Sequence, residues 1–194
     1  IANLTYKPKI EVKDSDGKEV LFQNVRSSRT NDNHLDTLFM AKIKSLGYAT
    51  YWLQRDPEAK AEKEVTAEQN FFMENEHIMV AFDKETGYIK NLVSKETGIE
   101  FASDNYVAIP TVISDEETDT WAHNVFKFHN VKGFMELQSI KRIEDGELRS
   151  VIRTVHKFND SYLTQDFILA KNQKTLRVDC KAMWQEKFSL LKMS

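Results

Sequence analysis

The sequence contains little cysteine, glycine and proline, and it has no long apolar run. Its single cysteine, Cys180, excludes an internal disulfide and is typical of a reducing compartment, so we expect a cytoplasmic protein. Because Cys180 lies in a strand-like run, we expect its thiol to be packed in the core or half-buried. Six glycines and three prolines argue against a disordered chain. No apolar run approaches the ~20 residues of a membrane span, and no charged-then-apolar leader opens the chain.

The net charge of the chain is also small. A formal net charge of −3 gives no electrostatic attraction to nucleic acid or to an anionic membrane. We therefore expect neither a nucleic acid nor a membrane among its partners. The hydrophobic content of 41% is ordinary for a folded protein, so a sizeable core is expected.

Alternating apolar and polar residues dominate the second half of the chain. The run Ile140–Phe158 is interrupted by Asp145-Gly146, and Asp-Gly between alternating runs is the strongest local signal for a hairpin. A second pair of runs, Ser161–Ala170 and Lys174–Trp184, predicts another hairpin. This half is therefore expected to form antiparallel β-sheet.

Two turns with the same four letters occur upstream of these hairpins. Lys84-Glu85-Thr86-Gly87 and Lys95-Glu96-Thr97-Gly98 separate apolar runs between His77 and Ala102. Each turn ends in a glycine, which adopts a positive φ without a steric penalty. The segment predicts a three-stranded meander, and turn chemistry explains the repeated letters.

The first fifty residues also show strand patterns. Asp14-Ser15-Asp16-Gly17 lies between Tyr6–Val12 and Glu19–Val25, which predicts a hairpin. Two further predicted strands are Leu35–Ile43 and Gly47–Gln54, the latter rich in β-forming residues.

A charged segment without aromatic residues follows at 55–69. It has no apolar stripe to bury, which is typical of a linker. We therefore expect an all-β chain in three parts: a small antiparallel β-sandwich-like unit at 1–54, a linker at 55–68, and the N-terminal portion of a large β-sandwich at 69–194.

An acidic stretch between Ala102 and Asn130 holds the residues most suited to a binding site. Trp121 is suited to stack on a sugar ring, with Asp119 and His123 forming hydrogen bonds to hydroxyl groups, because carbohydrate sites combine an aromatic face with a few polar groups. These three are the candidate sugar-contacting residues. The alternative is a solvated acidic loop, with Trp121 buried in the sandwich or at a domain interface.

Two other kinds of site fit the same stretch less well. A carboxylate pair of Asp119 with Glu116 or Glu117 needs a fixed separation of ~5 Å or ~6.5–9.5 Å, which the sequence of a loop does not provide. His123 and His129 would lie ~20 Å apart in an extended chain, too far for one metal ion. We therefore assign no catalytic residue and no metal ligand.

Five phrases of the sequence occur in an order that resembles a known family. They are DGKEVLFQ (Asp16–Gln23), AKIKSLGYATYWL (Ala41–Leu53), ENEHIMVAFDKETGYIKNLVSKETGIEF (Glu74–Phe101), DTWAH (Asp119–His123) and RVDCKAMWQEKFSLLKMS (Arg177–Ser194). Together they resemble the non-catalytic C-terminal β region of family 38 glycoside hydrolases, the α-mannosidases, in particular the bacterial type. The resemblance covers nearly the whole chain. It implies that the large sandwich is of the galactose-mutarotase-like kind.

The resemblance implies a function for a parent protein. Family members hydrolyse α-mannosidic bonds with retention, using a carboxylate nucleophile and a second carboxyl as acid/base, and a zinc ion binds sugar hydroxyls. The resemblance places these groups in an N-terminal catalytic domain of the same chain. No catalytic residue is therefore carried over, no cofactor is expected in this segment, and zinc is expected in the parent enzyme. We expect the segment to support that domain and to contact an α-mannoside during glycan breakdown, in a bacterial cytoplasm.

A second function stays open at this point. Galactose-mutarotase-like folds resemble the large sandwich, so the chain also fits a freestanding carbohydrate-binding or mutarotase-like protein. Mutarotation needs a general acid and base in a concave sheet, for which His123, His156 and Glu136 are the candidates. Their convergence in an enclosed pocket would favour this function. Whichever holds, unpaired edge strands are expected to cause self-association.

Overall fold

The computed structural model describes residues 10–26, 35–55, 70–102, 105–114, 123 and 127–194. Within these ranges the chain forms strands and no helix, and therefore no helix that is long and apolar enough to cross a membrane. The strands are β1 (Ile10–Asp14), β2 (Phe22–Arg26), β3 (Leu35–Phe39), β4 (Tyr51–Arg55), β5 (Phe72–Glu74), β6 (Ile78–Phe82), β7 (Ile89–Ser94), β8 (Pro110–Ser114), β9 (Val131–Phe134), β10 (Glu136–Asp145), β11 (Arg149–Phe158), β12 (Ser161–Ala170), β13 (Arg177–Met183) and β14 (Ser189–Met193). The predicted all-β, sandwich-like class is confirmed.

The chain divides into two compact units, which are described separately. The first consists of residues 1–67 with 144–149, and the second of residues 68–143 with 150–194. The predicted linker at 55–68 lies almost wholly outside the described residues. The predicted boundaries 1–54, 55–68 and 69–194 therefore stay a prediction.

The first unit contains two antiparallel strand pairs, β1 with β4 and β2 with β3. The predicted hairpin after β1 forms only a turn, with Gly17 at φ 77° and a single bridge between Lys13 and Glu19. The ladder of β1 runs instead along β4, from Ile10↔Arg55 to Asp14↔Tyr51. Turn residues fix where a chain reverses, whereas side-chain packing selects the strand that pairs.

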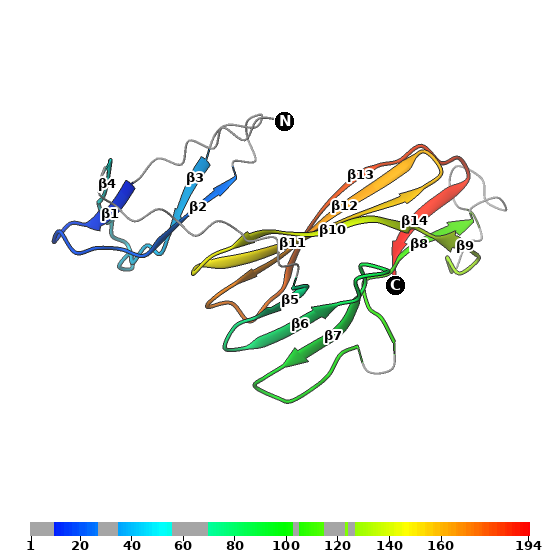
Figure 1. The fold of residues 1–194 in the computed structure, drawn as a ribbon, viewed down its shortest axis with the longest axis horizontal. Helices are drawn as coiled ribbons and strands as arrows, with labels where there is room; N and C mark the ends of the chain where they lie inside the picture. Colours follow the sequence, from blue (N-terminus) through cyan, green and yellow to red (C-terminus); the bar gives the residue numbers. More distant parts are fainter. Residues whose placement is uncertain (1–9, 27–34, 56–69, 103–104, 115–122, 124–126) are drawn as a thin grey trace. The chain divides into compact units, whose positions relative to one another are not determined.

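The second unit is built on a four-stranded antiparallel sheet in the order β10-β11-β12-β13 (Figure 1). The alternation in the sequence of β12 becomes an alternation of buried and half-buried side chains along the whole strand. Successive side chains of a strand point to opposite faces, so one face of this sheet belongs to the core. Both hairpins predicted from the sequence, β10–β11 and β12–β13, are confirmed.

A three-stranded sheet, β5-β6-β7, packs on part of that face. Phe82 of β6 meets Phe167 of β12 edge to face, with ring centroids 4.8 Å apart. The shared core is made of buried residues from both sheets: Met73, Ile78, Val80, Phe82, Ile89, Ile140, Ile152, Phe167 and Leu169. Two sheets that share one core form a β-sandwich.

A second three-stranded sheet, in the order β14-β8-β9, contributes a separate core cluster. Val112 of β8 is buried with Met135 and with Leu163 of β12, and Trp184 and Leu191 pack against them. Two smaller sheets thus cover part of the face of the large sheet.

The predicted meander is correct for β6 and β7 and wrong for its third strand. The third strand of this sheet is β5, whereas the run after β7 forms only the bridge Val93↔Glu100. The Glu100 carboxylate accepts hydrogen bonds from the backbone N–H groups of Leu92 and Ala102, at 2.8 and 3.0 Å. Because the Glu100 side chain accepts from these backbone N–H groups, they are not available for a regular strand ladder after β7.

Candidate functional site

The stretch predicted to contact sugar lies in the connection between β8 and β9. Asp119 and Trp121 lie outside the described residues, so their contact with a sugar stays a prediction. His123 lies in a turn and its side chain is exposed. The described residues therefore locate the base of the loop and one of its three candidates.

The base of this loop is held by the β14-β8-β9 sheet. The N–H of Ser114 donates to the carbonyl of Asn130 at 2.8 Å, which joins the two ends of the connection. The register of β8 against β9 shifts between Val112 and Ile113, both of which are buried. β14 pairs with the other side of β8. A loop mounted on a rigid, buried strand is a common support for a contact surface.

Exposed apolar side chains lie along β9 and just before it, a feature that the sequence interpretation missed. Phe128, Val131 and Phe134 are 42%, 53% and 54% exposed. Lys192 of β14 donates to the carbonyl of Phe128 at 3.4 Å, and Lys132 donates to the Ser189 hydroxyl at 3.3 Å. Aromatic rings beside ammonium groups can contact the apolar and polar faces of a sugar.

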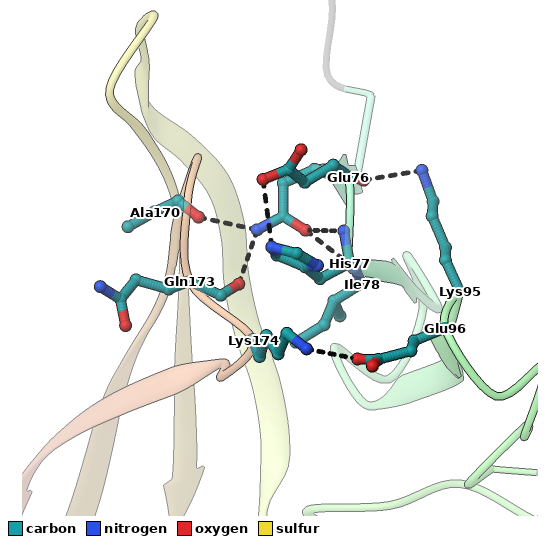
Figure 2. Close-up of polar contacts among 9 residues, drawn as sticks. Glu76, His77, Ile78, Lys95, Glu96, Ala170, Gln173 and Lys174 are labelled. Carbon is teal, nitrogen blue, oxygen red and sulfur yellow. Dashed lines mark hydrogen bonds and ion pairs between the residues drawn. The ribbon is translucent and has the colours of Figure 1, made fainter.

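A cluster of polar contacts joins β5-β6-β7 to the turn between β12 and β13 (Figure 2). The amide nitrogen of Asn75 donates to the carbonyls of Ala170 and Gln173, at 2.7 and 2.9 Å. Its amide oxygen accepts from the N–H groups of His77 and Ile78, both at 2.8 Å. One short side chain thus satisfies backbone groups of two elements, which is a structural role.

Charged side chains appear in the same view (Figure 2). Figure 2 shows Lys174 reaching Glu96, an ion pair of 2.6 Å between side chains that are each 61% exposed. The hydrogen bond and the charge of Lys174 lower the pKa of Glu96, and the charge of His77 adds to this. His77 lies 3.1 Å from Glu76. The Glu96 and Lys174 charges lie at the surface and compensate each other.

His156 of β11 is the only one of the five histidines that the structure places in the core of the described part of the chain. It is 0% exposed, its Nε2 lies 2.9 Å from the carbonyl of Thr86, and its ring stacks on Tyr88 at 5.7 Å. Donation from Nε2 leaves Nδ1 as the acceptor, and no described residue bonds to it. Burial lowers the pKa of His156, partly opposed by the hydrogen bond to Thr86. The ring is therefore a neutral packing element.

The three residues considered for mutarotase chemistry have different environments. His156 is fully buried, whereas Glu136 and His123 are exposed. A proton donor inside the core does not reach a sugar that an exposed carboxylate contacts. The arrangement of the described residues therefore does not favour this chemistry.

Zinc ligands were not expected in this segment, and the described residues contain no group of three or more His, Cys, Asp or Glu side chains that would hold a metal ion. The sequence has one His-x-Asp triplet, His34-Leu35-Asp36. His34 lies outside the described residues, and Asp36 is an exposed residue of β3.

The phrase around Trp184 is also structural. Trp184 packs against the second core cluster. Glu186 accepts hydrogen bonds from Asn159 and from the Ser161 hydroxyl, both at 2.9 Å, and these bonds lower the pKa of its carboxyl. Glu186 therefore fixes the turn between β11 and β12.

Cys180 differs from its sequence-based expectation. We expected a packed or half-buried thiol, but the residue is exposed in β13. Its β12 partner in the ladder, Gln165, is buried. The reason is that no described element covers β13, so the core side of the sheet is open at this strand.

Comparison with known proteins assigns the second unit to a family. Residues 73–194, more than half of the chain, match the model of the glycosyl hydrolases family 38 C-terminal domain. A search of curated proteins found no match. The matched range begins in β5 and includes all strands of the sandwich described above. The chain therefore belongs to glycosyl hydrolase family 38 and carries its C-terminal domain.

Proposed function

We propose that this chain is the non-catalytic β region of a zinc-dependent, retaining α-mannosidase that acts on α-mannosides in glycan breakdown. The observation that carries the proposal is the family match over residues 73–194. The chain supports an N-terminal catalytic domain of the same protein, which holds the nucleophile, the acid/base carboxyl and the zinc ion. We place the parent enzyme in a bacterial cytoplasm, in line with the single cysteine.

The contacts of the family-like phrases support a structural role. Asn75, Gly87 and Glu186 belong to the phrases that carry the resemblance, and each is engaged inside the fold. Asn75 bonds backbone groups of two elements, Gly87 packs beside His156, and Glu186 holds a turn. Because these three residues make contacts inside the fold, a structural role accounts for their presence and no catalytic role is needed.

The second part of the proposal is that the Asp119–His123 loop contacts the substrate. Its base on β8 and β9 is braced by the Ser114–Asn130 hydrogen bond. The exposed Phe128 adds aromatic surface close to Asn130 at this base. An aromatic surface with nearby polar groups is the composition of a sugar-binding surface.

A third part concerns self-association. Edge strands offer unpaired N–H and C=O groups to another strand. We propose that the chain self-associates through such an edge.

The catalytic part is tested by assaying the 194-residue chain with an aryl α-mannoside and added zinc. We expect no turnover above background, because the reacting groups belong to the catalytic domain. Turnover that disappears in an Asp119→Asn variant would contradict the proposal. In the parent enzyme, Asp119→Asn should raise KM for an oligomannoside while leaving kcat for a small aryl mannoside unchanged.

Sugar contact is tested by titrating mannose against tryptophan fluorescence, with galactose as the competing sugar. The chain has three tryptophans, so the matched control is Trp121→Phe, which removes only the loop fluorophore. A mannose-dependent change that is absent in this variant supports the contact. An unchanged signal in Trp121→Phe would assign the response to Trp52 or Trp184 and contradict it.

A further inference from the structure

β13 is an edge strand of the large sheet. It pairs with β12 from Tyr162↔Met183 to Ile168↔Arg177, and no strand of the described chain pairs with its other side. Every residue of β13 is exposed. In an antiparallel ladder, alternate residues turn their N–H and C=O groups to opposite neighbours. The free side of β13 therefore carries a row of unpaired backbone groups.

The two faces of β13 have different chemistry. The residues opposite buried positions of β12 are small or apolar: Val178, Cys180 and Ala182. The residues on the other face are mostly charged: Arg177, Asp179, Lys181 and Met183. A strand that pairs with this edge must match an apolar row on one face and a charged row on the other.

The charged row is unevenly compensated within the chain. Asp179 lies opposite Asp166 of β12, and its carboxylate accepts two hydrogen bonds of 2.8 Å from the exposed Arg177. Asp166 already accepts hydrogen bonds of 2.6 and 2.7 Å from Arg153. Lys181 lies opposite Thr164 and has no ion pair within the described residues. Both carboxylates are thus paired with an arginine, whereas Lys181 has no anion beside it in the described residues.

Antiparallel pairing of β13 with its own copy is limited to a few registers. Residues that face each other must point to the same side of the sheet, so the twofold axis passes through a residue position. An axis at Asp179 places Asp179 against itself and Arg177 against Lys181. An axis at Lys181 places Lys181 against itself. Like charges directly opposite one another are unfavourable.

An axis at Cys180 satisfies both faces. It pairs all seven residues of β13, places Asp179 of each copy opposite Lys181 of the other, and places Val178 opposite Ala182. An axis at Val178 or Ala182 leaves most of the strand unpaired. Charge and length therefore select the same register.

We propose that the open edge of β13 is a docking surface for β13 of a second copy of this chain, in the antiparallel register centred on Cys180. This inference rests on the proposed self-association and specifies its site. The two sheets then continue as one eight-stranded sheet, with two reciprocal Asp179–Lys181 contacts. Such contacts add to the backbone hydrogen bonds of a paired edge, the mode known as β-augmentation.

The register brings the two Cys180 residues face to face. Opposed residues of an antiparallel pair have Cα atoms about 4.5–5.5 Å apart, and a disulfide accommodates about 4.4–6.8 Å. Because Cys180 is the only cysteine, a disulfide-linked dimer reports this contact alone. Partial desolvation of the exposed Cys180 thiol raises its pKa, and Asp179 and Asp166 add to this, so oxidation is slow at neutral pH.

The decisive experiment is a charge exchange followed by sedimentation equilibrium of the 194-residue chain. The wild-type mass should rise from 22.6 kDa towards twice that value with increasing concentration. Asp179→Lys and Lys181→Asp should each weaken dimerisation about tenfold, because each creates like-charge pairs across the axis. The double variant Asp179→Lys with Lys181→Asp should restore it. Far-UV circular dichroism shows that each variant is folded.

A second measurement traps the register. Copper phenanthroline with dissolved oxygen, which accepts the two electrons released by two thiols, should crosslink the wild type at mildly alkaline pH. The single charge variants should crosslink less and the double variant as well as the wild type. Cys180→Ser is the matched control, which should lose the covalent dimer and keep the sedimentation behaviour.

The outcomes separate this inference from the proposed self-association. If the wild type associates but the charge variants associate equally well, another surface is responsible and the β13 register is wrong. A wild-type chain that stays monomeric at all concentrations would contradict both. Neither outcome bears on the assignment to an α-mannosidase.

Discussion

Two turns of this molecule have the same four letters but different surroundings. In both, the glycine N–H donates to the carbonyl four residues earlier, at 2.8 Å for Gly87 and 2.7 Å for Gly98. Their φ angles are 71° and 70°. A Cβ on Gly87 would lie 2.6 Å from Leu137 and 3.2 Å from His156, whereas a Cβ on Gly98 would meet nothing within 4 Å. Identical local sequence thus gives identical backbone, and the tertiary surroundings decide what each turn contributes.

The largest expected difference is between Gly87→Ala and Gly98→Ala. Both place a side chain at a positive φ, which costs about 1–2 kcal/mol. Gly87→Ala also forces Leu137 or His156 to move, and overpacking of a core costs a further ~1–3 kcal/mol. We expect a loss of about 3 kcal/mol or more for Gly87→Ala and about 1 kcal/mol for Gly98→Ala, measured by hydrogen–deuterium exchange of β11 amides. Equal losses would show that the backbone conformation alone matters.

The second difference is a pH dependence near neutral pH that belongs to the first turn, whose Thr86 carbonyl binds the buried His156. The pKa of His156 is lowered from 6.5 by burial. The unfolded chain therefore binds the proton more readily, so stability is full above about pH 6.5 and falls as the pH drops towards the folded-state pKa. His156→Gln should flatten the slope of the free energy of unfolding between pH 7.5 and 5. Gly98→Ala, which destabilises without touching His156, should keep the slope.

The third difference is the residue that precedes each turn. Asp83 accepts hydrogen bonds from the N–H groups of Glu85 and Thr86 at 2.8 and 2.9 Å, and from the Tyr106 hydroxyl at 2.9 Å. Burial alone would raise the pKa of Asp83, but these hydrogen bonds lower it overall. The hydroxyl of the counterpart, Ser94, accepts one long bond, 3.4 Å from the N–H of Thr97.

We therefore expect Asp83→Ala to cost about 1–2 kcal/mol, since bonds to a charged acceptor are lost. Ser94→Ala should cost less than about 0.5 kcal/mol. Both free energies of unfolding are measured by urea titration of the second compact unit. Asp83→Asn is the matched control, because its amide keeps one oxygen acceptor. A Ser94→Ala loss as large as that of Asp83→Ala would contradict the comparison.

The turns also show how far the sequence predicts this fold. Hairpins β10–β11 and β12–β13 were predicted because alternation and turn residues are local signals. The pairing of β1 with β4 was not, because strands distant in sequence compete for the same ladder. The exposure of Cys180 was missed because alternation shows which side chains share a face but not which element covers it.

The candidate site was less predictable than the fold. The sequence placed Asp119, Trp121 and His123 in one loop, and of these only His123 is within the described residues. The burial of His156 was not predicted, because a single strand pattern does not show that Gly87 leaves room for its ring. The loop base on β8 depends on pairing with β14, which lies far along the chain.

The smallest expected effect concerns the tertiary contact of the second turn, the ion pair between Glu96 and Lys174. Both side chains are 61% exposed, and solvent screens such pairs strongly. Lys174→Ala should therefore leave the urea midpoint unchanged within error, even though the two atoms are only 2.6 Å apart. Asn75→Ala is the reference from the same cluster, because its side chain makes four hydrogen bonds to backbone groups and their loss leaves several unsatisfied. A clear loss of stability in Lys174→Ala would mean that the ion pair anchors the second turn to β12–β13. Both turns would then be anchored, the first by packing and the second by charge.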